Sequence, residues 1–128
     1  MLHYELFDFT EPWKPKNNPI VLVHGISGDN QMWFYQIPEF SKHFPIITVD
    51  LPGHGKNSHI SEAISIEEMA EQLFRTLQTT GINKFNFIGI SLGGIITTEL
   101  AAKHPEMIDK LVIVGTPRNI PEEYKSFI

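Results

Sequence analysis

The residues with the clearest chemical potential form the segment Gly89-Ile90-Ser91-Leu92-Gly93. A serine hydroxyl becomes an effective nucleophile only when a substrate can reach it and a base is held beside it. A sharp turn from a strand into a helix exposes a serine in this way, and glycines two positions before and after it relieve the crowding of the backbone. The segment therefore predicts a nucleophilic serine. The alternative is a glycine-rich turn in which Ser91 only caps the following helix.

The residues around this segment have the pattern that such a turn requires. Residues 85–90 are rich in β-branched and aromatic side chains, as in a strand, and an apolar helical pattern follows Ser91 and ends by Pro105. The free N–H groups at the start of that helix would point toward an oxyanion formed near Ser91. Three further short apolar runs are typical of strands buried on both faces, at 20–23, 45–49 and 111–114.

Helical patterns separate these strands. Ser65 and Glu68 form a capping-box pattern before apolar residues spaced three and four apart, and Gly81 lies where a C-terminal cap is expected. A less regular apolar helix is predicted from about residue 30 to residue 44, bent or broken at Pro38. A weaker apolar pattern near the N-terminus predicts an opening strand. This order predicts an α/β fold: a mostly parallel sheet with helices on both faces.

The composition limits the partners of the chain. Its 128 residues fit one domain, with 41% hydrophobic residues, a net charge of −5 and no cysteine. The basic residues are not clustered, so we expect neither nucleic acid nor a membrane surface as a partner. The absence of cysteine excludes disulfides and thiolate metal sites, and the histidines lack the spacing of metal ligands, so no metal or cofactor is expected. The first residues do not resemble a signal peptide, so a cytoplasmic location is the default expectation.

Three turns with functional residue types follow three of the predicted parallel strands: His24-Gly25, residues 50–55 and Ser91. Since the carboxyl ends of parallel strands meet at one edge of a sheet, we expect these turns to lie together. The motifs H-G-I-S-G at 24–28, D-L-P-G-H-G at 50–55 and G-I-S-L-G-G at 89–94, with the segment 104–116, make the chain similar to the α/β-hydrolase family. The segment after residue 28 resembles the esterase, enol-lactonase and C–C hydrolase branch.

The resemblance implies roles for single residues. Ser91 would be the nucleophile, and the backbone N–H groups of Ile26 and Leu92 would form the oxyanion hole. The residues that shape the turns would be His24, Gly25, Gly89, Gly93 and Asp50, with His24 orienting its loop rather than transferring protons. The implied reaction is hydrolysis of a carboxylic ester, a lactone or a related carbonyl bond of a small acyl substrate, through an acyl-enzyme.

The family places its catalytic acid and histidine after the nucleophile, beyond a later strand. This sequence stops just past the strand after Ser91, so we expect residues 1–128 to be the N-terminal part of a single α/β-hydrolase domain, truncated there, with 118–128 starting the cap or lid. No catalytic acid or histidine is identified, and the chain alone is expected to be weakly active or inactive. The alternatives are a non-catalytic half-fold that binds a ligand or partner, and a truncated gene product. An exposed sheet edge would favour self-association or pairing with a partner chain.

Other polar residues are weaker candidates for the acid or the base. His54 lies at the expected sheet edge but is a turn residue in the family, and Asp109 and His104 are expected at the opposite edge. Glu122 and Glu123 lie in the tail with nothing to anchor them, and two other histidines are expected on the surface: His43 and His59. Asn57, where relatives often have serine, is interpreted as tolerable loop variation. Three apolar residues that would suit an acyl pocket are expected in the core instead: Trp33, Phe40 and Ile64.

Overall fold

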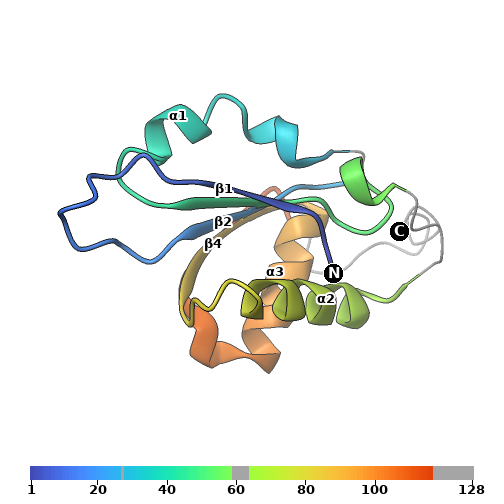
Figure 1. Cartoon of the computed structure of the whole chain (residues 1–128). Coiled ribbons are helices and arrows are strands. Elements are labelled where there is room, and N and C mark those ends of the chain that lie inside the picture. The colour runs from blue at the N-terminus through green and yellow to red at the C-terminus, as the bar shows by residue number, and fades with distance from the viewer. Residues whose placement is uncertain (27, 59–63, 117–128) are drawn as a thin grey trace.

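A computed structural model of the chain describes residues 1–26, 28–58 and 64–116 (Figure 1). Five strands form one sheet in the order β1-β3-β2-β4-β5. Their bounds are β1 (Tyr4–Phe7), β2 (Ile20–Val23), β3 (Ile46–Val49), β4 (Phe85–Ile90) and β5 (Ile108–Val114). Strand β1 is antiparallel to β3, and the other neighbouring pairs are parallel. The sheet is therefore mostly parallel, as the sequence predicts.

Helices cover both faces of this sheet. The α-helices are α1 (Ile37–Phe40), α2 (Ile66–Gln78) and α3 (Leu92–Lys103), and the 3₁₀ helices are η1 (Asn30–Trp33), η2 (Gly55–Asn57) and η3 (Pro105–Met107). In Figure 1, α2 and α3 lie on one side of the strands, and α1 lies on the other. This arrangement confirms the predicted α/β fold. No helix in the described ranges is long and apolar enough to cross a membrane.

The continuous apolar runs of β2 and β3 are explained by burial on both faces, since every residue of both strands is buried. Val21 and Val23 belong to the core cluster that includes α2 and α3, whereas Ile20 and Leu22 belong to a second cluster that includes Trp33 of η1. Alternate residues of one strand thus serve two separate cores.

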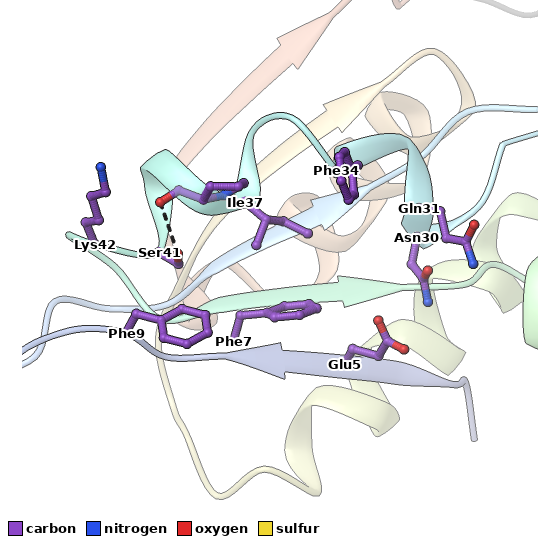
Figure 2. A pocket seen from close by; sticks show the side chains of 10 residues that line it. Glu5, Phe7, Phe9, Asn30, Gln31, Phe34, Ile37, Ser41 and Lys42 are labelled. Carbon is purple, nitrogen blue, oxygen red and sulfur yellow. Dashed lines mark hydrogen bonds between the residues drawn. The ribbon is translucent and has the colours of Figure 1, made fainter.

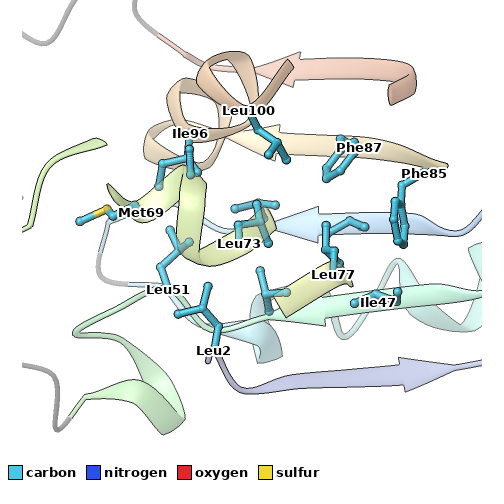
Figure 3. Packing of buried hydrophobic residues seen from close by; sticks show 14 of the residues in the cluster. Leu2, Ile47, Leu51, Met69, Leu73, Leu77, Phe85, Phe87, Ile96 and Leu100 are labelled. Carbon is cyan, nitrogen blue, oxygen red and sulfur yellow. The ribbon is translucent and has the colours of Figure 1, made fainter. Parts of the chain in front are cut away.

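The larger core lies between the sheet and the helices α2 and α3 (Figure 3). Its side chains leave almost no surface exposed; they include Leu73 and Leu77 of α2, Phe85 and Phe87 of β4, and Ile96 and Leu100 of α3. Burying side chains of this size contributes about 1.5–3 kcal/mol each. The packing fixes α3 against β4 and so fixes the turn that joins them.

The structure differs from the sequence-based expectation between residues 30 and 44. Two short helices, η1 and α1, replace the single predicted helix. Asp29 caps η1, its carboxylate accepting the N–H of Gln31 at 2.8 Å. Pro38 lies in the first turn of α1, where its missing N–H costs nothing, so the predicted helix is broken just before Pro38 and not bent at it. Trp33 and Phe40 pack against the second core cluster, as expected.

Strand β5 begins at Ile108, three residues earlier than predicted, and its outer edge is open. No strand pairs with that edge in the part of the chain that the structure describes. Val112 is 51% exposed, and Ile113 and Val114 are each 46% exposed. These side chains give the edge an apolar surface next to unpaired backbone groups, a combination that favours association.

Candidate functional site

Ser91 joins β4 to α3 in a conformation that a residue with a side chain rarely adopts. Its φ is 54° and its ψ is −117°, and among the described residues it is the one non-glycine with positive φ. Such a conformation costs about 1–3 kcal/mol and persists only where the surroundings impose it. The strain places a partly exposed serine at the N-terminus of a helix of twelve residues.

Glycines let the elements around Ser91 approach one another closely. A Cβ on Gly93 would overlap the carbonyl oxygen of Val23 and lie 2.6 Å from that of His24, so the first turn of α3 rests directly on the end of β2. A Cβ on Gly89 would lie 2.6 Å from the carbonyl oxygen of Gly93. Both glycines are needed because backbone, which cannot move aside, occupies the space of a methyl group.

The same packing brings the His24-Gly25 turn to Ser91. A Cβ built on Gly25 would lie 3.0 Å from Ser91 Cβ and 3.6 Å from Ser91 Oγ. Ile26 follows directly and is 41% exposed, and Leu92 is the first residue of α3. Neither the Ile26 nor the Leu92 N–H donates to an acceptor within the described residues. Among the described residues, one unpaired donor thus directly follows Ser91, and the other directly follows Gly25, which packs against Ser91.

His24 holds this turn with both ring nitrogens. Its Nε2 accepts the backbone N–H of Leu51 at 3.0 Å, so the proton is on Nδ1, which donates to the carbonyl of Gly25 at 2.7 Å. The ring is fully buried, and this burial lowers the pKa of His24 below its usual value. A neutral imidazole with both nitrogens in use has no free site at which to accept a proton from Ser91.

The burial of His24 predicts a pH dependence of stability. Unfolded histidine titrates near pH 6.5, and the folded pKa is lower, so the unfolded chain binds more protons between the two values. The contribution of His24 to the free energy of unfolding should have its full value above about pH 6.5. Below that pH, the free energy of unfolding should fall by up to about 1.4 kcal/mol per pH unit. Urea unfolding across this range measures the slope. His24→Asn should flatten it, whereas His43→Asn, at an exposed position, should not; equal slopes in the two variants would disprove the role.

Asp50 connects the end of β3 to two loops at this sheet edge. Its buried carboxylate accepts the N–H and the side-chain amide of Asn30, at 2.8 and 3.2 Å, and the N–H of Lys56 at 3.1 Å. Its carbonyl accepts the side-chain amide of Asn57 at 2.6 Å. A Cβ on Gly55, where φ is +49°, would lie 2.5 Å from the carboxylate. The structure thus places Asp50 at the centre of the turn, bonded to loops rather than to Ser91.

The other candidate acids and bases are also bonded elsewhere. His54 Nδ1 lies 3.0 Å from the carbonyl of Pro52, in its own loop. His104 ends α3, stacks on Phe74 at 3.5 Å and lies 3.2 Å from Glu71. Asp109 is the second residue of β5, at the sheet edge opposite Ser91, and a hydrogen bond from Asn18 lowers its pKa.

Three of the remaining candidates, His59, Glu122 and Glu123, fall outside the described residues. His43 is exposed near Glu39. Within residues 1–26, 28–58 and 64–116, no group of three histidine or acidic side chains could hold a metal ion. Ile64, like Trp33 and Phe40, lies in or against a core cluster, as expected.

Sequence reasoning missed three polar residues of this region. Asn57 is buried and bonds to Asp50, so it belongs to the turn and is not tolerable loop variation. Asn30 binds Asp50, and Thr116 donates its hydroxyl to the Ser91 carbonyl at 3.2 Å. The Asn30 and Thr116 bonds join residues 20 and 25 positions apart, and the Asn57 bond spans seven positions of an irregular loop, so a single sequence contains no local signal for these pairs.

A groove lined by described residues is separate from this site. It has a volume of about 820 Å³ and lies between β1 and the η1–α1 segment (Figure 2). Phe7 and Phe9 lie on one side of it, and Ile37 and Phe34 lie on the other. Ser91 is not among its lining residues, so we assign it no part in the chemistry.

The strain at Ser91 predicts an inverted preference between glycine and alanine. At an ordinary helix or strand position, alanine is more stable than glycine by about 0.5–1 kcal/mol. At φ 54° the Cβ is the source of the strain, so Ser91→Gly should be more stable than Ser91→Ala, by about 1 kcal/mol. Thermal and urea unfolding of the pair measures the difference. The usual order, with alanine the more stable, would show that the turn is not strained.

Comparison with known proteins shows the family of the chain. The profile described as "alpha/beta hydrolase fold" matches residues 18–126. The chain is 27% identical over 100 residues to the (E)-2-((N-methylformamido)methylene)succinate hydrolase of Acinetobacter baylyi, covering 78% of this chain and 38% of that protein.

Solved structures of hydrolases have the same fold as this chain. The enol-lactonase from Burkholderia xenovorans LB400 matches with a TM-score of 0.81 and 31% identity, over 94% of this chain and 45% of that one. A thermophilic esterase from Thermogutta terrifontis matches with a TM-score of 0.84 and 28% identity, over 98% and 44%. The chain spans less than half the length of these relatives. Because the family profile covers most of its residues and the fold agrees, the chain belongs to the α/β-hydrolase family.

Proposed function

We propose that this chain carries the nucleophile and the oxyanion-binding groups of a serine hydrolase that cleaves carboxylic esters or lactones. The observation that supports it most is the strained Ser91 at the N-terminus of α3, with the His24-Gly25 turn packed against it. A serine whose hydroxyl only capped the helix would bond an N–H of the first turn, but Ser91 makes no such side-chain bond.

The proposed reaction has two steps. Ser91 Oγ attacks the carbonyl carbon of the substrate, and the resulting oxyanion accepts hydrogen bonds from the N–H groups of Leu92 and Ile26. The carbonyl C–O bond then breaks, and the alcohol oxygen takes the proton that the base removed from Ser91. The alcohol departs from an ester, or stays attached to the acyl chain of an opened lactone, and water hydrolyses the acyl-enzyme that remains. No described side chain makes a hydrogen bond with Ser91 Oγ, and His24 has both ring nitrogens in use, so the base that takes the Ser91 proton is not identified among the described residues.

The substrate class rests on the relatives. Their names describe a hydrolase of a substituted succinate, an enol-lactonase and an esterase. The names of the enol-lactonase and the esterase indicate an ester or lactone carbonyl, and a serine nucleophile with two N–H donors would attack such a carbonyl. We therefore propose a small molecule with such a carbonyl as the substrate.

Hydrolysis of a p-nitrophenyl ester by the purified 128-residue chain tests the proposal. Loss of both base and acid lowers turnover by about 10⁴- to 10⁶-fold from a typical value of about 10 per second, so we expect about 10⁻³ per second or less. The residual rate should disappear in Ser91→Ala and persist in the matched variant Ser41→Ala, which lies on the η1–α1 side of the sheet. A residual rate that Ser91→Ala leaves unchanged would contradict the proposal. Turnover above about 1 per second that Ser91→Ala abolishes would show that the chain has its own base.

A second candidate function, partner binding, is favoured by the open edge of β5. Its half-exposed apolar residues would be covered if the edges of two copies paired. Light scattering should then give twice the 14.6 kDa mass of the chain, and Val112→Lys should return it to 14.6 kDa. Leu6→Lys, on the opposite edge strand, is the control and should leave the dimer intact. A chain that stays monomeric at high concentration would exclude this candidate.

A further inference from the structure

We infer that Thr116 is a positioning residue for the Ser91-Leu92 peptide, and through it for the N–H of Leu92. The inference rests on the proposed function, in which that N–H binds the oxyanion. Thr116 follows β5 and lies 25 residues from Ser91 in the chain. Its hydroxyl donates to the Ser91 carbonyl at 3.2 Å.

The end of β5 and the residues after it bind both the N–H and the carbonyl of the strained Ser91. The Ser91 N–H donates to the carbonyl of Val114 at 3.0 Å, and the Ser91 carbonyl accepts the Thr116 hydroxyl. The N–H groups of Gly94 and Ile95 reach the same carbonyl from inside α3, at 3.0 and 3.3 Å. Since a strained conformation persists only when its surroundings impose it, β5 supplies the contacts from outside the turn and the helix.

The hydrogen bond from Thr116 acts on Leu92 because the peptide bond is planar. The Ser91 carbonyl and the Leu92 N–H belong to the same rigid unit and point in opposite directions. A donor that fixes the carbonyl on one side therefore fixes the direction of the N–H on the other side. Thr116 would therefore fix the direction of the Leu92 N–H without touching the substrate.

Two glycines make this contact possible. A Cβ on Gly94 would overlap Thr116 Oγ1 and lie 2.9 Å from Ile113 Cγ2, so only glycine leaves room for the hydroxyl over the start of α3. Gly115, with φ +55°, turns the chain after β5 so that Thr116 points back toward the helix. Both glycines thus serve the approach of Thr116 to Ser91.

The hydroxyl of Thr116 has a second acceptor, the carbonyl of Val114 at 3.1 Å. A hydroxyl donates one hydrogen, so a bond only to Val114 would make Thr116 a local cap of the strand end. If the hydroxyl binds the Ser91 carbonyl, its removal should change the direction of the Leu92 N–H. If it binds only the Val114 carbonyl, its removal should leave that direction unchanged.

The first measurement is the kinetics of Ser91 labelling by a fluorophosphonate. Removing an oxyanion donor costs about 100- to 1,000-fold, and misdirecting one should cost less, so Thr116→Val should lower the maximal labelling rate about tenfold with little change in the half-saturating concentration. Thr116→Ser keeps the hydroxyl and should retain the rate. Thr98→Val is the matched control, because its exposed hydroxyl bonds the Gly94 carbonyl on the same helix, away from Ser91.

The second measurement needs no reactivity. The residual dipolar coupling of the Leu92 N–H, measured by NMR on aligned protein, reports the direction of that bond. It should change in Thr116→Val and be restored in Thr116→Ser, and it should stay at the wild-type value in Thr98→Val. Amides of β4 provide the control for an intact fold. Should Thr116→Val not fold, Thr116→Ala takes its place in both measurements.

The outcomes separate this inference from the proposed function. If wild-type Ser91 does not label but the Leu92 coupling responds to Thr116→Val, the proposed function fails and the positioning of the peptide by Thr116 holds. If Ser91 labels and Thr116→Val changes neither the rate nor the coupling, the inference is overturned and the proposed function stands. A slower rate that Thr116→Ser does not restore would also overturn it, because the methyl group and not the hydroxyl would then be responsible.

Discussion

Replacing Gly93 by alanine should remove most of the stability of the chain. The added Cβ would overlap the carbonyl oxygen of Val23 and lie 2.6 Å from that of His24. Both atoms are backbone at the end of a buried central strand and cannot move aside without breaking the sheet. We expect a loss of about 3–5 kcal/mol, beyond the 1–3 kcal/mol that overpacking of side chains usually costs. Urea unfolding followed by circular dichroism measures the loss.

Gly81→Ala is the matched control for this change. Gly81 has φ +73°, so alanine is strained there, but a Cβ would meet nothing within 4 Å. Gly81→Ala should lower the free energy of unfolding by about 1–2 kcal/mol, because only the left-handed backbone conformation opposes it. If the two variants differ by less than about 1 kcal/mol, α3 does not rest on β2 as described.

Replacing Asp50 by alanine should have the second largest effect on stability. The change leaves two buried donors without an acceptor, the N–H and the side-chain amide of Asn30, and also the partly buried N–H of Lys56. Each unpaired buried donor costs about 1–3 kcal/mol, and relaxation of the loops recovers part of this, so we expect a total of about 3 kcal/mol. The free energy of unfolding at neutral pH is the measurement. Asp50→Asn keeps one acceptor oxygen and should lie between alanine and the wild type.

Asp109→Ala is the control for Asp50. Asp109 also accepts an amide hydrogen bond, from Asn18, but it is exposed at the other end of the sheet. Its replacement should change stability by about 0.5 kcal/mol or less. A comparable loss in both variants would mean that the Asp50 carboxylate is not the centre of the turn.

The strand-turn-helix around Ser91 could be predicted from the sequence because its requirements are local. The strand composition, the glycines two positions away and the helical pattern are adjacent in the chain, and close approach of backbone demands glycine whatever the rest of the fold. The buried strands β2 and β3 could be predicted for the same reason, as continuous apolar runs.

In the segment 30–44, the local sequence pattern did not predict the correct helices. Trp33 and Phe40 pack in the second core cluster, whereas Phe34 and Tyr35 are exposed. The apolar residues of the segment therefore have a spacing that two short helices satisfy as well as one long helix. The hydrogen bonds of Asn30, Asn57 and Thr116 could not be predicted at all, because their partners are up to 25 residues away. Such bonds form only where the order of strands in the sheet brings distant loops together, and that order cannot be predicted from local sequence patterns.

The most direct test of the central claim, that Ser91 is the nucleophile, is site-resolved labelling with a fluorophosphonate. The intact 128-residue chain is incubated with the reagent, and peptide mass spectrometry gives the rate at each serine. Ser91 lies in a strained turn, and the N–H groups of Leu92 and Ile26 bind no acceptor among the described residues. We therefore expect Ser91 to label at least about 100-fold faster than the other serines, because oxyanion binding alone retains about 10³-fold catalysis. Ser91→Ala should abolish the label and His43→Asn should leave it. Labelling spread evenly over the serines, or unchanged in Ser91→Ala, would contradict the account.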